Sequence, residues 1–130
     1  LIFLVVIFVI CIFIFSPTGM VGQKEQIDLT LDELITLYSN KYGVSSYQIR
    51  RTIECESHFN NIQSNVVKNG VREESYGVAQ IHLPSHPHIT KEQALDISFA
   101  IEFMAQELKN GRDWKWYGYN KYTDECKSGY

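Results

Sequence analysis

A chain of 130 residues with a formal net charge of −3 can form one small domain. It has no run of basic residues, so nucleic acid is not an expected partner. Its eight Tyr, seven Phe and two Trp can fill a core and still line a groove. We see no internal repeat and no low-complexity segment after the apolar start.

The first fifteen residues, LIFLVVIFVICIFIF, are apolar and carry no charge. This length fits the hydrophobic part of a signal peptide or of a membrane anchor. A buried core helix is the alternative, but the run has no polar face. Ser16 to Gly22 shows no clear cleavage site, which favours an anchor, and we interpret Cys11 as a membrane residue. We therefore expect residues 1–16 to be a signal peptide or a membrane anchor.

Residues 17–28 are expected to be a linker, and residues 29–130 the folded domain. The expected location is the cell envelope, with the domain held at the membrane or free in the periplasm or the extracellular space. Such a place is oxidising. We therefore predict that Cys55 and Cys126, the two cysteines of the domain, form a disulfide between the C-terminal tail and a helix, with two unpaired thiols as the alternative.

Two helices are predicted at the start of the domain. Thr30 and Glu33 have the spacing of a capping box, in which each side chain bonds the backbone N–H of the other residue. Apolar residues follow at helical spacing, and Gly43 is expected to end this helix. Ser45 and Gln48 repeat the capping-box spacing, so a second helix is expected to begin there.

Glu56 is the residue of most interest in the second helix. At about 100° per residue, Ile49, Ile53 and Glu56 fall on one stripe, whereas Glu54 falls on the opposite side. A carboxyl at the end of an apolar stripe is partly desolvated, which raises its pKa. Such an acid can keep its proton near neutral pH and donate it to a leaving group. The alternative is a frayed helix end, where Glu56 meets solvent.

A short antiparallel β-ribbon is predicted after this helix. Asn69-Gly70 stands between residues that favour strands, which is a strong hairpin signal. We expect the ribbon to pack beside the helix that carries Glu56. Glu73 and Glu74 follow it, and we interpret both as part of a solvated turn.

The segment that follows contains two candidate binding residues. Gly77 would allow close approach of the backbone to a ligand, and Gln80 can both donate to and accept from a sugar amide. The alternative is a strand glycine and a surface glutamine. His82, His86 and His88 come next and suggest a zinc site. No cysteine or acid is close in sequence, so we expect a solvated loop at the rim of a groove, with no metal and no cofactor.

One long helix and an aromatic tail complete the domain. Thr90 and Gln93 form a third capping-box pattern, and apolar spacing continues to about Asn110, which predicts a single scaffold helix with Met104 in the core. The tail contains Trp114-Lys115-Trp116-Tyr117 and more tyrosines. Aromatic faces can stack on sugars, although we expect Trp114 and Trp116 to close the core.

Several short motifs taken together resemble the lysozyme-like superfamily, and most closely the lytic transglycosylases of the soluble-lytic and goose-type lysozyme kind. The resemblance spans roughly residues 29–120. It rests on the ordered spacing of Glu56-Ser57, Phe59-Asn60, Gly77-Val78-Ala79-Gln80-Ile81 and Tyr119-Asn120. The chain departs from the family pattern at Gly118, where Ala is usual, and in lacking a Gly after Asn120.

The resemblance implies an α+β, mostly α, lysozyme-like fold with a small antiparallel β-ribbon. It also implies cleavage of the β-1,4 bond after N-acetylmuramic acid in peptidoglycan, with Glu56 as the single acid and base and a 1,6-anhydro product. Ser75 occupies the place of the second catalytic carboxylate of some lysozymes. The residues assigned to substrate by this resemblance are Ser57, Tyr76, Gly77, Gln80, Tyr119 and Asn120. Tyr119 is expected to lie near Glu56 and to orient it or the substrate.

Two alternatives remain open. Water could attack instead of the sugar hydroxyl, as in a lysozyme-type hydrolase, with Glu74 as helper. The domain could also be a non-catalytic module that binds peptidoglycan. The expected partners are glycan strands and, through residues 1–16, a membrane. The domain is expected to be a monomer.

Overall fold

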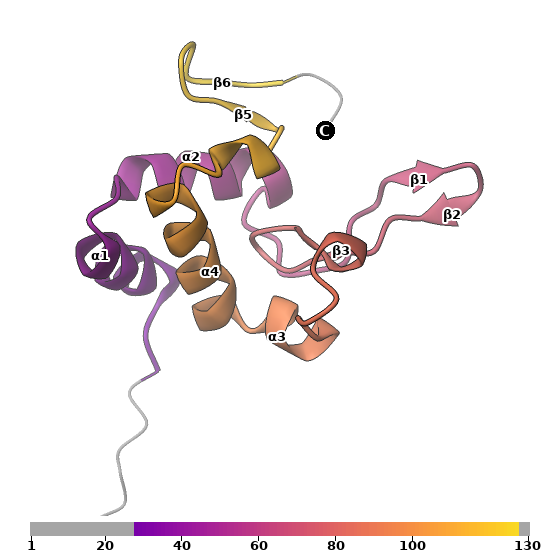
Figure 1. The fold of residues 1–130 in the computed structure, drawn as a ribbon, viewed down its shortest axis with the longest axis horizontal. Coiled ribbons are helices and arrows are strands. Elements are labelled where there is room, and N and C mark those ends of the chain that lie inside the picture. Colours follow the sequence, from indigo (N-terminus) through magenta and orange to yellow (C-terminus); the bar gives the residue numbers. More distant parts are fainter. Residues whose placement is uncertain (1–27, 128–130) are drawn as a thin grey trace, which may run out of the picture.

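The computed structural model describes residues 28–127. About half of this part is helical and the rest includes small antiparallel hairpins (Figure 1), so the α+β class is confirmed. The predicted anchor or signal peptide, and nearly all of the predicted linker, lie outside the described residues. None of the helices within residues 28–127 has the length and apolarity needed to cross a membrane.

The first two helices begin and end where local signals predict. In α1 (Leu31–Tyr42), both halves of the Thr30–Glu33 capping box form, and Gly43 ends the helix in the left-handed conformation with φ of 67°. In α2 (Ser46–Ser57), the Ser45 hydroxyl accepts a hydrogen bond from the N–H of Gln48. Short polar side chains at N-cap positions satisfy backbone donors that have no partner in the helix.

The predicted long helix is two helices, so this prediction was wrong. The Thr90–Gln93 capping box begins α3 (Lys91–Leu95), which has only five residues. A second helix, α4 (Ile97–Lys109), begins after a single intervening residue. Asp96 separates them, with an extended backbone and a carboxylate that accepts from the N–H of Phe99 at 2.7 Å. An aspartate can cap a new helix, and this bond competes with helix continuation.

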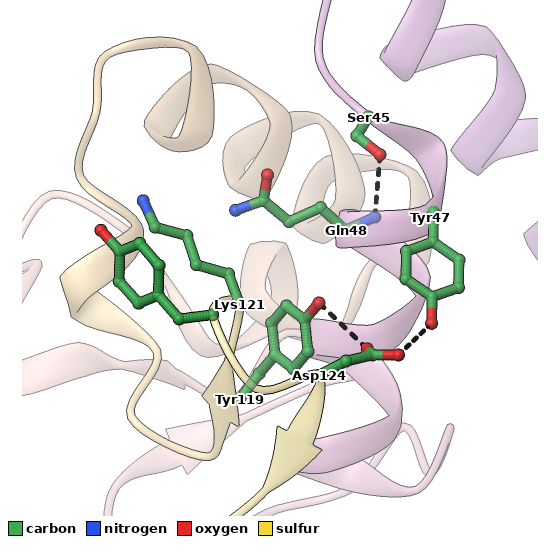
Figure 2. Close-up of a pocket in the computed structure, with 7 residues that line it drawn as sticks. Ser45, Tyr47, Gln48, Tyr119, Lys121 and Asp124 are labelled. Atoms are coloured by element: carbon green, nitrogen blue, oxygen red, sulfur yellow. Dashed lines mark hydrogen bonds between the residues drawn. The ribbon is translucent and has the colours of Figure 1, made fainter.

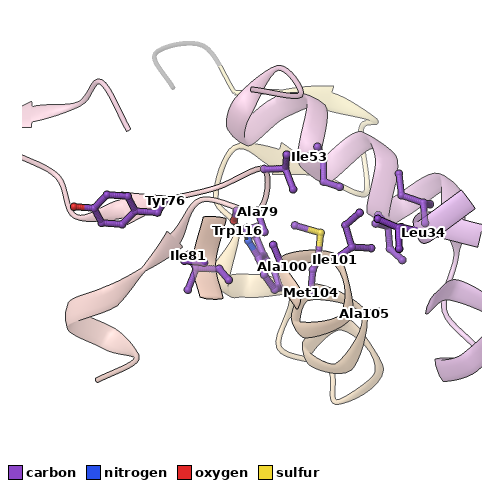
Figure 3. Packing of buried hydrophobic residues seen from close by; sticks show 14 of the residues in the cluster. Leu34, Ile53, Tyr76, Ala79, Ile81, Ala100, Ile101, Met104, Ala105 and Trp116 are labelled. Carbon is purple, nitrogen blue, oxygen red and sulfur yellow. Dashed lines mark hydrogen bonds between the residues drawn. The ribbon is translucent and has the colours of Figure 1, made fainter. Parts of the chain in front are cut away.

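The core lies between α4 and the two N-terminal helices (Figure 3). Ile49 and Ile53 of α2 and Ile101 and Met104 of α4 are fully buried, as the apolar spacing predicts. Each such side chain contributes roughly 1.5–3 kcal/mol relative to an exposed position. Trp116 is also buried and donates its indole N–H to the carbonyl of Ala79 at 2.8 Å. This bond attaches the C-terminal tail to the core.

The predicted hairpin forms, but it does not pack beside α2. Strands β1 (Val67–Lys68) and β2 (Val71–Arg72) pair around Asn69 and Gly70, whose φ angles of 53° and 77° suit a tight hairpin turn. All four strand residues are exposed, and Figure 1 shows the hairpin projecting from the body of the molecule. Without a buried face it has nothing to hold it against α2.

Two further hairpins were not predicted. Strands β3 (Ser75–Tyr76) and β4 (Ile81–His82) pair inside the domain, and the single turn η1 (Leu83–Ser85) follows β4. After α4 come the single turn η2 (Asp113–Lys115) and strands β5 (Tyr119–Asn120) and β6 (Glu125–Cys126). The hairpin β5–β6 lies along α2 (Figure 1). It therefore brings the tail next to the helix that carries Glu56.

Candidate active site

Glu56 is half-buried one residue before the end of α2, and its carboxylate faces the tail. Its Oε1 atom accepts a hydrogen bond from the backbone N–H of Gly118 at 2.7 Å. Burial raises the pKa of Glu56, while the Gly118 N–H and the charge of Lys127 act in the opposite direction and the charge of Glu73 adds to the rise. The net effect is a raised pKa, as a proton donor requires.

Gly118 can approach Glu56 because it has no side chain. A Cβ atom at position 118 would lie 2.9 Å from Oε1 of Glu56 and 3.2 Å from the carbonyl oxygen of Cys55. The residue that departs from the family pattern is thus the one that contacts Glu56. Because Oε1 is occupied as an acceptor, a proton on this carboxyl would be carried by Oε2.

A disulfide holds the tail in this place. The predicted bond between Cys55 and Cys126 is present, with Cα atoms 5.2 Å apart. Cys126 pairs with Tyr119 in the β5–β6 ladder, and the Lys127 N–H donates to the Gly118 carbonyl at 2.9 Å. The disulfide therefore joins Cys55, the residue before Glu56, to β6, whose partner strand β5 directly follows Gly118.

Glu73, rather than Glu74, is the second carboxylate of this region. Glu74 is exposed, as predicted for a solvated turn, whereas Glu73 is half-buried. The Glu73 carboxylate accepts from the hydroxyl of Ser64 at 3.1 Å and lies 3.6 Å from the ammonium of Lys68. Its charge acts on Glu56, and like charges disfavour ionisation. The sequence interpretation of Glu73 as solvated was therefore wrong.

Tyr119 does not orient Glu56 as expected. Its hydroxyl donates to Asp124 at 3.3 Å, and the Arg51 guanidinium lies 5.9 Å from the centre of its ring. The hydroxyl of Tyr47 donates to the same carboxylate at 2.5 Å, as Figure 2 shows. Tyr47, Tyr119 and Asp124 line an open pocket of about 460 Å³ at the start of α2. The contact with Glu56 comes instead from the preceding residue.

A second open pocket, of about 390 Å³, lies between η2 and the β5–β6 hairpin. Asn120 lines it, and its side-chain oxygen accepts from the N–H of Tyr122 at 3.0 Å, which shapes the β5–β6 turn. Glu56 lines neither pocket. Trp114 also lines the second pocket and is 61% exposed, so the expectation that it closes the core was wrong.

Three predicted binding residues make contacts within the protein instead. The Ser57 hydroxyl is buried and donates to the carbonyl of Ile53 at 3.0 Å. Gly77 does allow a close approach, but to protein: a Cβ there would lie 1.8 Å from the carbonyl oxygen of Ala94 in α3. Tyr76 is buried too, with the Lys91 ammonium 5.1 Å from its ring centre. The Ser57 bond lies within α2, whereas the contacts of Gly77 and Tyr76 join separate segments and are not visible in the sequence.

Gln80 uses the amide half of its side chain within the protein. Its side-chain N–H₂ group donates to the carbonyls of Gly77 and Ile62, at 2.8 and 3.2 Å. That leaves the side-chain oxygen as an acceptor. The backbone at Gln80 is left-handed with φ of 47°, as it is at His58 and Phe59 just after α2. Left-handed backbone costs a non-glycine residue roughly 1–2 kcal/mol. Local hydrogen bonds accompany it here, from the N–H of His58 to the Glu54 carbonyl and from the N–H of Gln80 to the Gly77 carbonyl.

The three histidines do not meet as metal ligands. The His82 ring bonds the hydroxyl of Ser85 at 2.8 Å, and the His86 ring packs edge-on against Phe103 with centroids 5.1 Å apart. Burial lowers the pKa of His86. Across residues 28–127, no three His, Cys, Asp or Glu side chains gather where a metal ion could be held.

Comparison of the chain with protein-family models, with curated proteins and with solved structures finds no match. The function must therefore be inferred from the site itself. The site consists of a half-buried acid, a backbone donor on one of its oxygens, a nearby lysine and a nearby second carboxylate.

Proposed function

We propose that the chain is a peptidoglycan lytic transglycosylase of lysozyme-like fold, with Glu56 as its single acid and base. The observation that carries this proposal is the placement of Glu56: half-buried, raised in pKa, and held through Oε1 by Gly118. A carboxylic acid in such a setting suits proton donation to a glycosidic oxygen. The motif resemblance supplies the substrate class.

The chemistry needs one protein carboxyl. Glu56 gives the proton on Oε2 to the leaving oxygen, and the bond from that oxygen to the anomeric carbon breaks. The acetamido oxygen of the substrate stabilises the positive charge that develops at that carbon. Glu56, now a carboxylate, then takes the proton of the 6-hydroxyl, whose oxygen bonds to the anomeric carbon and closes the 1,6-anhydro ring. The proton returns to Glu56, so one turnover leaves the enzyme unchanged.

A hydrolase is the second candidate, and Glu73 is the observation that favours it. A carboxylate whose charge reaches Glu56 could help to orient water in place of the sugar hydroxyl. The product then carries a reducing end and is heavier than the anhydro product by one water. Mass spectrometry of fragments released from defined glycan strands distinguishes the two outcomes.

The test compares Glu56→Gln with Glu54→Gln in the full chain. Glu54 lies on the same helix but pairs with Arg51 and is 42% exposed through its side chain. Glu56→Gln should fold normally and lose roughly 1,000-fold or more in release of soluble fragments from purified peptidoglycan. Glu54→Gln should keep near-normal release. Near-normal release by the Glu56→Gln variant would refute the assignment, and wild-type binding without any release would favour a non-catalytic module.

A further inference from the structure

The second open pocket, called the tail pocket from here on, is lined by aromatic rings that do not serve the core. Trp114 is 61% exposed, Tyr117 53% and Tyr122 87%. Trp116, between the first two, turns inward and is anchored to Ala79. The Trp116 ring thus anchors this segment, while the rings of Trp114 and Tyr117 stay in solvent. Grouped exposed aromatic side chains are typical of binding surfaces.

The volume and lining of the tail pocket suit a sugar. Its roughly 390 Å³ falls within the range of about 300–1,000 Å³ that is usual for small-molecule sites. Tyrosine and tryptophan offer flat apolar faces to sugar C–H groups and polar atoms to sugar hydroxyls. The pocket lies on the β5–β6 hairpin, which the Cys55–Cys126 disulfide holds against α2.

The charge of the pocket selects among sugars. It contains two lysines. Lys121 is paired with Asp113 at 2.5 Å. Lys127 forms no salt bridge within residues 28–127, and its ammonium lies 5.8 Å from the centre of the Tyr117 ring. One cation beside an aromatic face is therefore left to pair with an anion on the ligand.

We infer that the tail pocket binds a saccharide unit that carries a carboxylate, with its ring on Tyr117 and its carboxylate on Lys127. This inference rests on the proposed function, because muramic acid units and their attached peptides supply such carboxylates. Tyr117 and Tyr119, which both line the pocket, flank Gly118, whose N–H bonds the Glu56 carboxylate. A unit bound there would neighbour the bond to be cleaved.

The test measures binding to the Glu56→Gln chain, which cannot consume its ligand. The two probes are a peptidoglycan oligosaccharide with free carboxylates and chitohexaose, which has N-acetylglucosamine units and no carboxylate. Adding Lys127→Gln should weaken binding of the first about tenfold or more and leave the second unchanged. Adding Tyr117→Ala should weaken both. Lys109→Gln is the matched control, since the Lys109 ammonium lies 5.9 Å from the Tyr42 ring centre, and it should change neither.

Equal binding of both probes by the parent and by Lys127→Gln would overturn the inference. So would a loss with Lys109→Gln that matches the loss with Lys127→Gln, because the effect would then be general attraction. The proposed function is tested separately in the wild-type chain. If that chain cleaves peptidoglycan and Lys127→Gln leaves its KM unchanged, the pocket inference fails while the function stands. If it binds the carboxylated probe through Lys127 but releases nothing, the pocket inference stands and the enzyme proposal fails.

Discussion

Replacing Cys126 by Ser should loosen the tail from α2. The disulfide closes a loop with a sequence separation of 71 residues, and the chain-entropy relation for that length gives about 4 kcal/mol of stabilisation. Cys126 is exposed, so the serine itself adds no buried polar group. We therefore expect the free energy of unfolding to fall by about 2–4 kcal/mol, since measured values often lie below the relation.

The same change should alter Glu56. With the hairpin released, the Gly118 N–H no longer bonds Oε1, and Lys127 no longer stays close. Both groups hold the pKa of Glu56 down against burial. Their loss raises that pKa further if Glu56 remains buried. The alkaline limb of the pH–rate profile, where the acid loses its proton, should then move to higher pH.

Urea unfolding and the pH dependence of kcat/KM, each measured with and without dithiothreitol, test this reasoning. Reductant should reproduce the Cys126→Ser effect in the wild-type chain and change nothing further in the variant. A change in unfolding free energy below about 1 kcal/mol would show that the disulfide does not constrain the tail. An unmoved alkaline limb, with stability lowered as expected, would show that Gly118 and Lys127 do not set the pKa of Glu56.

Three further changes test other contacts. Gly118→Ala should fold, but its Cβ atom would lie 2.9 Å from Oε1 of Glu56 and push the carboxylate out of place. We expect kcat/KM to fall about 100-fold; unchanged kinetics would refute the close approach. Gly77→Ala should cost more than about 2 kcal/mol in urea unfolding, because φ is 80° and the Ala94 carbonyl blocks a Cβ; a cost within about 0.5 kcal/mol would contradict it. Hydrogen bonds from Arg112, and then pairing with Lys115, lower the pKa of Glu107 from 4.5 to about 2. Its contribution, about 2–3 kcal/mol, is therefore present above pH 4.5 and lost as pH falls toward 2. Glu107→Gln should destabilise the chain by that amount at pH 7 and hardly at all near pH 2, as urea unfolding at the two pH values would show.

Local signals in the sequence were reliable where a few neighbouring residues decide the structure. The Thr30–Glu33 and Thr90–Gln93 boxes and the Asn69-Gly70 turn form as predicted, because each depends on hydrogen bonds and backbone angles within four residues. The helical period also placed Glu56 on the buried side of α2. Asp96 was missed because apolar spacing continues across it, while its capping bond stops one helix and starts the next.

Contacts between residues far apart in the sequence could not be predicted from these local signals. Gly118 lies 62 positions after Glu56, and no pattern in either segment specifies that the two will meet. The pairing of Cys55 with Cys126 supplied a constraint that joins these segments, but it did not reveal which backbone group would face the carboxylate. Gly77 was predicted to allow close approach of a ligand, whereas the group that approaches it in the structure is the backbone of α3.

The contact between Glu56 and Gly118 also has a consequence for the order in which a newly made chain becomes competent. During translation Glu56 is synthesised first, and Gly118, whose N–H bonds its carboxylate, is added 62 residues later. The sulfur partner at Cys126 follows, and it bonds only where thiols can oxidise. Under the proposed function, and with the export that the sequence predicts, a nascent or reduced chain inside the cell would have Glu56 without its hydrogen bond from Gly118, so cleavage of peptidoglycan would become possible only after export.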